Sequence, residues 1–480
     1  MATRLTPQET GARLDRLAWS PMHTTILIAL GAGWLFDSFE VQMFSNAIGP
    51  LGTYFHATVF EQDAVLAVWL GGILFGALLG GRLADRFGRR RLFLWTLLWY
   101  AGFTVLTGLS PDLTAVYGLR FLAALGVGAE YAIVNAAIAE FIPARVRGKA
   151  NAIVMNFWPA GAIAAGLLAF LVLDTFAIAA ATSWRYLFIF GGALALLVLL
   201  FRRRIPESPR WLVSQGRTVE AQQVLRSFEA SCGGSAPLPL HQNLDIDQLR
   251  APNQLGALRE LLTCYRWRLV LGATLDLSEA FGYYGIFALL SVVVLHQVHI
   301  SDRSMPLFYI LGNLGGLIGG LIMAQAFDRV GHLLMVAITY LLAAVGVILL
   351  ALATSSRDAH LVTAAFIVAN AAGTAAWTSA YPTFTELFPT HLRAAGVGTS
   401  VAIGRCGAII GTLYLPVLAV EIGTTASYSL VVGFWLLGFL GIVAYSLLGG
   451  IEPSRRSLEE VVNQVSGSTF KKGDHEPSEL

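Results

Sequence analysis

Long runs of apolar residues, broken by short polar segments, occupy most of the chain from residue 24 to residue 449. A helix needs about 20 such residues to cross a bilayer core of about 30 Å. Backbone groups in lipid must pair within the segment, so each run is predicted to be a helix. The predicted spans are residues 24–46, 63–82, 91–109, 113–136, 150–173, 184–201, 268–295, 304–326, 333–353, 359–381, 394–419 and 426–449.

A polar stretch divides the twelve predicted spans into two sets of six. Residues 202–267 contain Pro, Gly and Ser clusters such as "SCGGSAPLPL", and short amphipathic helices such as "TVEAQQVLRSF" are expected there. The fold class is therefore all-α integral membrane. The predicted organisation is an N-terminal six-helix bundle at 1–201, a cytoplasmic linker at 202–267, a C-terminal six-helix bundle at 268–450 and a disordered cytoplasmic tail at 451–480.

Composition narrows the class of protein. Hydrophobic residues make up 56% of the chain and charged residues only 13%, against about 25% charged in soluble domains. Cys232, Cys264 and Cys406 are few, odd in number and without metal-ligand spacing, so neither a disulfide framework nor a metal site is predicted. The polar N-terminus lacks the pattern of a removable signal peptide, and the first apolar segment is expected to remain as the first span. A net charge of +2 gives no indication of a nucleic-acid partner.

The placement of basic residues predicts the orientation. With the N-terminus inside, the 32 Lys and Arg residues fall on the cytoplasmic side except Arg120 and Arg405, which lie within spans, and Arg185, Arg303 and Arg357. Cytoplasmic loops carry an excess of Lys and Arg, so both termini are predicted to be cytoplasmic. The reverse orientation would put the basic runs "GRRR" and "FRRR" on the wrong side.

The two sets of spans repeat one another. "FDSFE" in span one matches "LDLSE" in span seven, "ADRFGRR" matches "FDRVGH", and "AEFIPARVRGKA" matches "TELFPTHLRAAG". The matched acids are Asp37 and Asp276, Asp85 and Asp328, and Glu140 and Glu386, which lie 239, 243 and 246 residues apart. Three matches in order at nearly one spacing indicate two parallel six-helix repeats, which in transporters face each other across a midplane cavity.

Several motifs resemble a known family. "GRLADRFGRRR" (residues 81–91) is similar to the loop 2–3 signature of the major facilitator superfamily. "RFLAALGVGAE" (120–130), "EFIPARVRG" (140–148) and "PESPRWLVSQGR" (206–217) resemble the branch that includes sugar porters, organic-cation transporters, niacin transporters and aromatic-acid/proton symporters. The resemblance covers essentially the whole chain. It implies two pseudo-symmetric bundles of six helices.

The span-one pattern narrows the choice within that branch. The two acids of "FDSFE" are similar to those of the aromatic-acid and niacin transporters, which usually carry a second Asp where this chain has Glu40. Sugar porters keep one acid and add several Gln and Asn in spans seven and eight. Here span seven offers acids and tyrosines, and Asn313 alone follows in span eight. A sugar substrate is disfavoured but stays open.

Acids inside the first bundle are the candidate proton-coupling groups. Asp37 and Glu40 share a helix face, which should point into the bundle because a charge facing lipid costs at least roughly 2.5–3.5 kcal/mol. Arg120 is the expected partner of Asp37, since it lies roughly 10 Å from the outer end of span four. Asp37 is predicted to carry the proton; the alternative is a static ion pair that fixes helix packing. Glu130 is either a second protonation site, a substrate contact or a carboxyl satisfied by small neighbours.

The second bundle supplies the candidate substrate contacts. Asp276 and Glu279 repeat the span-one acids, and Arg405 is either their counter-charge or a bidentate partner for a substrate carboxylate. Aromatic side chains near the presumed cavity are expected to stack on a planar ring, although most aromatics of the chain pack against lipid or each other. The remaining candidates are Trp158, Tyr283, Tyr284, Asn313, Trp377 and Tyr381.

Motif residues at the cytoplasmic face are predicted to form a gate. Glycines allow close helix approach and tight turns, acids accept from backbone donors at helix ends, and arginines pair with acids. The alternative is that the arginines only anchor the topology. The candidates are Gly81, Asp85, Arg86, Gly88, Arg89, Arg90, Glu140, Arg147, Asp328, Arg329, Glu386 and Arg393.

These features predict a secondary transporter rather than an enzyme. The sequence has no GxxxxGK[ST] phosphate-binding loop, so no cofactor is expected and the energy is expected to come from a proton gradient. The leading hypothesis is proton symport of a small organic acid or ring metabolite, benzoate- or nicotinate-like, by a monomer in the plasma (inner) membrane. Sugar or polyol symport, efflux of organic cations or drugs, and a membrane sensor are the alternatives.

Overall fold

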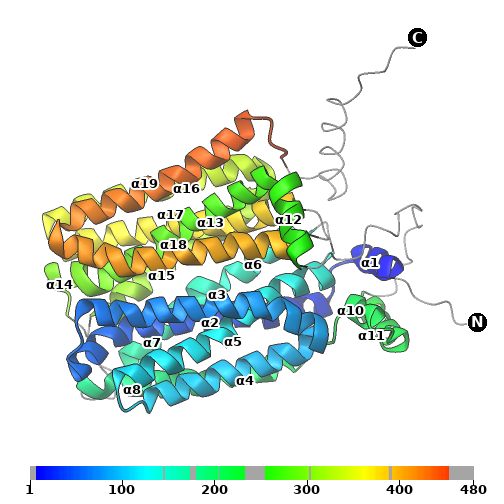
Figure 1. The fold of residues 1–480 in the computed structure, drawn as a ribbon, viewed down its shortest axis with the longest axis horizontal. Helices are drawn as coiled ribbons and strands as arrows, with labels where there is room; N and C mark the ends of the chain where they lie inside the picture. The colour runs from blue at the N-terminus through cyan, green and yellow to red at the C-terminus, as the bar shows by residue number, and fades with distance from the viewer. Residues whose placement is uncertain are drawn as a thin grey trace, which may run out of the picture.

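The computed structural model describes residues 7–143, 146–172, 180–203, 205–232, 254–301, 304–388 and 392–452. The apolar runs form long helices that lie side by side along one axis (Figure 1). The first six predicted spans become α2 (Pro21–Phe55), α3 (Val59–Phe87), α4 (Arg89–Gly108), α5 (Leu113–Phe141), α6 (Arg147–Met155) with α7 (Phe157–Phe170), and α8 (Ala180–Ala195) with α9 (Val198–Arg202). The last six become α13 (Arg266–Leu289) with η4 (Leu290–Val294) and α14 (Leu295–Gln297), α15 (Met305–Val330), α16 (His332–Ser356), α17 (Ala359–Leu387), α18 (Arg393–Glu421) and α19 (Thr424–Leu447).

Ten helices within the described residues are long and apolar enough to cross a membrane. The two predicted spans outside this set are α4 and α8. α4 begins with three consecutive arginines, and α8 has 16 residues and contains Arg185. Both nevertheless pack within the bundle, α4 against α5 and α8 against α2 and α4.

Local sequence signals set several helix ends. Thr58 begins α3 with a capping box, because its hydroxyl accepts from the Glu61 amide while the Glu61 carboxylate accepts from the Thr58 amide. Asp112 and Asp358 begin α5 and α17 with simple side-chain caps. Each carboxylate accepts from a backbone amide at 2.7–2.8 Å.

Two glycine turns have matching backbone conformations. They lie at the end of the bundle opposite to the helix starts at Thr58, Asp112 and Asp358. Gly88 joins α3 to α4 with φ = 89°, and Gly331 joins α15 to α16 with φ = 98°. A side chain is strained in this backbone region, so both turns favour glycine. The sequence repeat is therefore also a repeat of backbone conformation.

The helices form two sets that meet lengthwise. In Figure 1, α2–α5, α7 and α8 lie below, α13 and α16–α19 lie above, and α6 and α15 lie between them. The sets contact each other mainly where α3 packs on α18 and where α7 packs on α15. The domain boundaries at residues 201, 267 and 450 stay a prediction.

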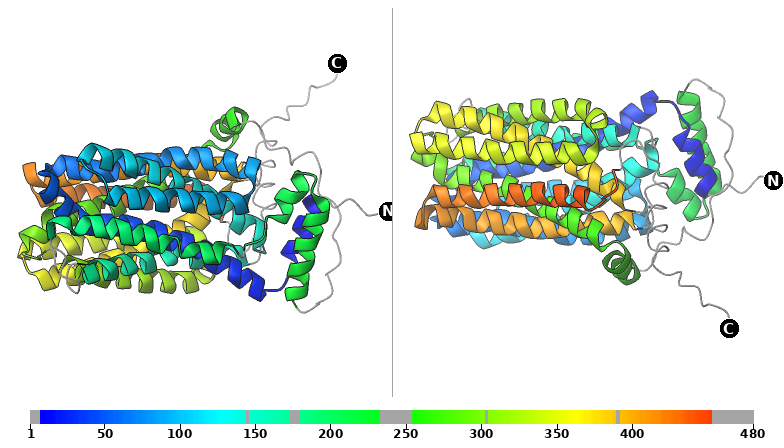
Figure 2. Two further views of the ribbon diagram at one scale, coloured as in Figure 1. Left: turned by 90° about the horizontal axis from the view of Figure 1, so that it is seen from below. Right: turned by 90° about the horizontal axis from the view of Figure 1, so that it is seen from above.

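Short helices gather at one end of the bundle (Figure 2). They are α1 (Pro7–Asp15), α10 (Pro209–Ser214), α11 (Thr218–Ser231) and α12 (Gln254–Cys264). α1 is tied to the linker helices by Arg13–Glu229 at 2.6 Å and Arg210–Asp15 at 3.8 Å. α11 contains the segment "TVEAQQVLRSF", so the prediction of a helix there is confirmed. We call this end of the molecule the α1 end; residues 453–480, most of the predicted tail, lie outside the described residues.

Candidate transport site

The paired acids of the first set lie in the middle of α2 and are almost fully buried, with exposures of 2% each for Asp37 and Glu40. Arg120 on α5 donates from Nη1 to Oε2 of Glu40 at 3.0 Å. The Thr104 hydroxyl on α4 donates to Oε1 of the same carboxylate. Glu40 therefore has an arginine and a hydroxyl as partners within the bundle.

The predicted pairing of Arg120 with Asp37 is wrong, because Arg120 pairs with Glu40. Two residues three apart on a helix differ by about 60° around the axis and by 4.5 Å along it, so one guanidinium reaches only one of them here. The rings of Trp69 and Phe188 flank the Arg120 guanidinium at 5.6 and 5.2 Å and hold it on the Glu40 side.

A second buried ion pair lies beside the first. Glu130 on α5 pairs with Arg202 at the end of α9, and both side chains have zero exposure. Arg202 also donates from Nη1 to the carbonyl oxygen of Phe93 at 2.9 Å. A methyl group at Gly33, one turn before Asp37 on α2, would overlap the Glu130 carboxylate. The pair therefore packs directly on the α2 backbone.

Arg202 is a residue that the sequence analysis missed. It belongs to "FRRR", a basic run at the end of an apolar segment, which is also the pattern of a lipid-interface anchor. The prediction for Glu130 left three alternatives open. The structure shows that Oε1 of its carboxylate pairs with an arginine, whereas Oε2 is buried without a hydrogen-bond partner among the described residues.

The cluster of Asp37, Glu40, Glu130, Arg120 and Arg202 contains three acids but only two arginines. Glu40 and Glu130 each have an arginine, whereas Asp37 has no ion pair with any described residue, and its Oδ1 is buried without a hydrogen-bond partner there. Glu130, Arg202 and Glu40 act on Asp37 electrostatically. An uncompensated buried carboxylate is costly. Binding one proton at Asp37 neutralises the cluster.

The corresponding acids of the second set have different neighbours. Asp276 on α13 lies so close to α18 that a methyl group at Gly404 would overlap its carboxylate. Arg405 and the Tyr381 hydroxyl act on Asp276. Among the described residues, however, no carboxylate forms an ion pair with Arg405 within 4.0 Å. Arg405 was predicted to be either the counter-charge of these acids or a partner for a substrate carboxylate. In the structure it forms no salt bridge with either acid.

Arg405 instead faces a cavity between the two sets of helices. Its guanidinium lies over the rings of Tyr131 at 5.3 Å and Tyr284 at 5.4 Å, one from each set. The free volume of the cavity is about 20 Å³, room for about one water molecule. Its walls are Trp34, Tyr131 and Trp158 from the first set and Glu279, Tyr283, Tyr284, Trp377, Tyr381 and Arg405 from the second.

Aromatic rings close the cavity across the boundary between the sets. Trp158 donates from Nε1 to the hydroxyl of Tyr283 at 2.9 Å. The Trp34 ring lies 5.9 Å from that of Trp158 and 5.8 Å from that of Trp377. Opening the cavity therefore requires the rings of the two sets to separate.

Most predicted substrate contacts line this cavity, and two do not. Asp276 lies behind it against α18. Asn313 is buried between α15 and α17, where its amide donates to the carbonyl of Tyr309 at 2.8 Å and accepts from Asn370 at 3.3 Å. Trp34 and Tyr131 were missed, although they stand three residues before Asp37 and next to Glu130 and so share the region of those acids.

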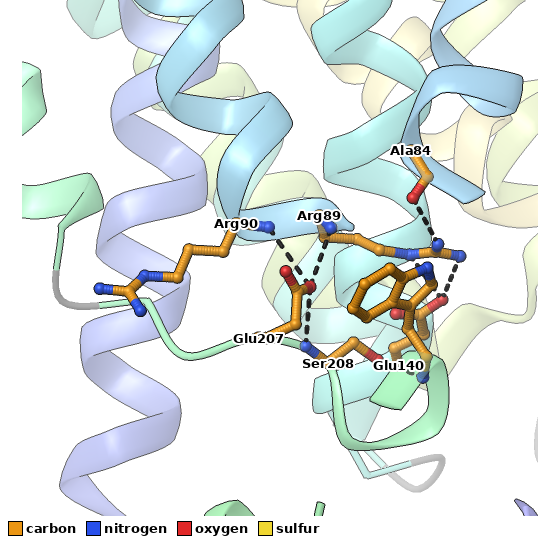
Figure 3. Close-up of polar contacts among 7 residues, drawn as sticks. Ala84, Arg89, Arg90, Glu140, Glu207 and Ser208 are labelled. Atoms are coloured by element: carbon orange, nitrogen blue, oxygen red, sulfur yellow. Dashed lines mark hydrogen bonds and ion pairs between the residues drawn. The ribbon is translucent and has the colours of Figure 1, made fainter. Parts of the chain in front are cut away.

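A polar network joins helices at the α1 end (Figure 3). Arg89 donates to Oε1 of Glu140 from Nη2 at 2.8 Å and from Nε at 3.2 Å, and to the carbonyl of Ala84 at 2.9 Å. The Glu207 carboxylate accepts from the amides of Arg89 at 2.8 Å and Ser208 at 3.1 Å. Glu207 thus caps the start of α4, where free amides favour an anion. The sequence analysis did not predict this role, although it identified the motif "PESPRWLVSQGR" that contains Glu207.

The same network recurs in the second set with different residues. Glu452 accepts from the amides of His332 at 2.9 Å and Leu333 at 3.0 Å, and so caps the start of α16. Nδ1 of His332 lies 3.1 Å from Oε2 of Glu386, and its ring stacks on Phe327. Glu452 had been assigned to the disordered tail, so that part of the prediction is wrong: this residue is ordered by the capping bonds.

The other predicted gate residues contribute less or lie outside the description. Arg86 is exposed beside the Phe87 ring, Arg90 donates to the carbonyl of Arg203 at 3.4 Å, and Arg329 is exposed. The surroundings of the remaining gate candidates lie outside what the structure describes. These candidates are Gly81, Asp85, Arg147, Asp328 and Arg393.

Comparisons with known proteins agree with this architecture. A family model described as "Sugar (and other) transporter" matches residues 33–462. The niacin transporter NiaP of Acinetobacter baylyi is 26% identical, with 94% of this chain and 99% of the relative covered. The arabinose-proton symporter of Bacillus subtilis is also 26% identical, with 91% and 93% covered.

Solved structures show the same fold at lower identity. The major facilitator superfamily proton:xylose symporter XylE, bound to 6-bromo-6-deoxy-D-glucose, superposes with a TM-score of 0.73 at 19% identity, over 92% of this chain and 98% of that chain. XylE from Escherichia coli in an inward-open conformation gives 0.66 at 20% identity, over 92% and 99%. With a family of transporters matched over most of its length and the twelve-helix fold reproduced, this chain belongs to the sugar (and other) transporter family and is an integral, multi-pass secondary transporter of the major facilitator fold rather than an enzyme.

Proposed function

We propose that the chain is a proton-coupled symporter for a small organic acid with a planar ring, benzoate- or nicotinate-like. It works by alternating access as a monomer in the plasma (inner) membrane, with the α1 end in the cytoplasm. The observation that carries the proposal is the buried Asp37, which has no ion pair with a described residue and stands three residues after Trp34 of an aromatic cavity that also holds Arg405.

Proton coupling follows from the charge count around Asp37. With Glu40 and Glu130 each balanced by an arginine, a proton on Asp37 removes the remaining negative charge of the cluster. The free-energy cost of keeping these side chains buried in the membrane interior is lower when the cluster is neutral. The molecule therefore rocks between its two open states more readily with the proton bound. Arg405 also acts on Asp37, so an anion bound at Arg405 weakens that attraction and favours the proton.

Substrate binding follows from the walls of the cavity. A guanidinium with no bound carboxylate suits the two oxygens of an organic acid, and tryptophan and tyrosine rings suit a flat ring. The described residues that line the cavity include no Gln or Asn, the side chains expected around sugar hydroxyls. The relative named as a niacin transporter agrees with such a substrate, whereas those named as arabinose and xylose symporters favour a sugar as the second candidate.

The networks at the α1 end supply the gate. Arg89–Glu140 joins α4 to α5 within the first set, and His332–Glu386 joins α16 to α17 within the second, so each network holds its own side of a gate that opens between the sets. Opening the cavity to this side must separate the two sets of helices, and the capped glycine turns keep α4 and α16 rigid while that happens.

The test is uptake by purified protein in liposomes, with nicotinate and benzoate as probes and a pH gradient that a protonophore removes. The wild-type protein is expected to concentrate at least one acid only while the outside is acidic. Asp37→Asn should abolish this accumulation but keep binding, because the amide preserves size and removes the titrating group.

A matched control is Asp63→Asn. Asp63 is also buried in a span, with 1% exposure and no partner for its carboxylate among the described residues, but it is no part of the Asp37 cluster. This variant should keep gradient-driven uptake. Accumulation by Asp37→Asn against a gradient, or uptake of arabinose or xylose in place of the acids, contradicts the proposal.

A further inference from the structure

Two opposite charges line the central cavity without pairing with each other. Glu279 and Arg405 are both buried, at 6% and 4% exposure, and both belong to the cavity wall. The described residues contain no nitrogen–oxygen contact between them of 4.0 Å or less. The two charges thus face one cavity without forming an ion pair.

Glu279 has an acceptor atom that nothing in the described structure uses. Its Oε2 is buried without a hydrogen-bond partner, and no Lys, Arg or His of the described residues forms an ion pair with it. Glu279 stands one turn before Tyr283 on α13, so both face the cavity. A buried carboxylate without a partner is costly, which makes this oxygen an acceptor for a group that enters the cavity.

Arg405 is a donor in the same condition. Its Nε is buried without a hydrogen-bond partner, and its contacts are the faces of Tyr131 and Tyr284. Ring faces attract a guanidinium but do not accept its in-plane N–H groups. The donors at the edge of Arg405 are therefore available for an anion.

A substrate that is only an anion satisfies Arg405 and brings its negative charge toward Glu279. A substrate that is only a cation satisfies Glu279 and meets Arg405. A molecule with both charges satisfies both side chains and adds no net charge to the cavity. The same wall carries the rings of Trp34, Trp158 and Trp377, which are in mutual contact. Once these rings separate, they offer faces to a flat ring that carries the two charges.

We propose that the preferred substrate is an aromatic zwitterion, whose carboxylate binds Arg405 and whose cationic nitrogen binds Glu279 across the ring. This inference rests on the proposed function and names the substrate class of the same cavity. It assigns Arg405 to the anionic end and Glu279 to discrimination between zwitterions and simple ring acids.

The experiment compares three probes that share one ring: benzoate, benzylamine and 4-(aminomethyl)benzoate. Their dissociation constants are measured at neutral pH by calorimetry on the purified full-length protein. The zwitterion should bind about 30-fold tighter than benzoate, the lower range for losing one partner of a buried charge pair. Benzylamine should bind most weakly, because it leaves Arg405 unpaired beside a second cation.

Variants identify the residue behind the preference. Glu279→Gln should reduce the gap between the zwitterion and benzoate to about twofold or less while benzoate binding is retained, since only the ammonium partner is lost. Glu279→Asp keeps the charge and should keep part of the preference. Arg405→Gln should weaken both carboxylates alike. Retained benzoate binding shows that Glu279→Gln is folded.

The outcomes separate this inference from the proposed function. Equal or tighter binding of benzoate by the wild-type protein, or a preference that survives Glu279→Gln, overturns the zwitterion while proton-driven uptake of benzoate leaves the symporter standing. Zwitterion binding without any proton-dependent uptake contradicts the symporter and supports the binding assignment. Binding of none of the three probes overturns both.

Discussion

The two acid pairs of the repeat, Asp37 with Glu40 and Asp276 with Glu279, occupy matching places in α2 and α13 but have different electrostatic surroundings. In the first set, arginines from α5 and α9 enter the bundle and pair with carboxylates. In the second set, the described arginine nearest these acids faces the cavity instead. The repeat fixes where acids stand along the helices, whereas the neighbouring helices decide whether they are paired.

The same sequence pattern thus supports two tasks in the two sets. We assign the proton to the first set, because paired acids there leave a single titrating group. We assign the substrate to the second set, because its Glu279 and Arg405 line the cavity and form no ion pair with a described residue. The α1 end shows a smaller difference of the same kind, since Arg89 in the first network is replaced by His332 in the second.

The largest effect is expected where the first set depends on a paired charge. Arg202→Gln should lower the free energy of unfolding by about 3–5 kcal/mol, because it leaves Glu130 buried without a counter-charge. The double change Glu130→Gln with Arg202→Gln should recover most of that loss. The measurement is thermal or denaturant unfolding of the purified protein.

Asp276→Asn is the matched change in the second set. Asp276 is also buried but has no described arginine within ion-pair distance, so this variant should destabilise the protein much less than Arg202→Gln does. Similar losses in the two single variants would contradict the distinction between a paired and an unpaired set.

The capping carboxylates are expected to show intermediate and nearly equal effects. Glu207→Gln and Glu452→Gln each weaken charge-assisted bonds to two or more helix-start amides, and each should cost about 1–2 kcal/mol of stability. Unfolding experiments on the two variants test this directly. A loss for one and none for the other would show that the repeat is structural in only one set.

The smallest effect concerns pH at the α1 end. His332 faces Glu386 from α17 and bonds through its amide to Glu452, while Arg329 of α15 is exposed nearby in sequence. A histidine is charged only when protonated, so its pairing with Glu386 should strengthen as the pH falls and weaken as the pH rises.

His332→Arg should therefore remove the pH dependence of this network, a change of about 1 kcal/mol or less for a partly exposed pair. The measurement is the melting temperature of the two proteins between about pH 6 and pH 8. The matched variant is Glu386→Gln, which removes the carboxylate that faces His332 and should likewise remove the pH dependence. An unchanged pH dependence in His332→Arg would exclude His332 as the titrating group.

Sequence patterns predicted the spans because hydropathy is a property of each segment alone. They also predicted that Asp37, Glu40 and Arg120 are buried, since charges in such segments turn away from lipid. They did not predict which acid Arg120 meets. A helix pattern gives the face of a residue, but the partner depends on how far neighbouring helices are shifted along their axes, and one turn is only 5.4 Å.

Arg202 and Glu452 show the same limit at span ends. A predicted boundary is uncertain by 2–4 residues, which is about one helical turn. Within that distance an arginine at the end of a span lies either among lipid headgroups or inside the bundle. Neither "FRRR" nor "GIEPS" contains information that separates these cases, since the deciding contacts, Glu130 and the amides of α16, come from distant parts of the chain.

The sequence by itself determined the helical membrane fold, the twofold repeat, the glycine turns and the burial of Asp37, Glu40 and Arg120, because each follows from local composition or from spacing along the chain. The tertiary structure alone decided which charges pair, which acid is left for a proton and which side chains enclose the cavity. These depend on contacts among helices that are distant in sequence, and buried electrostatic energies change steeply over a few ångströms.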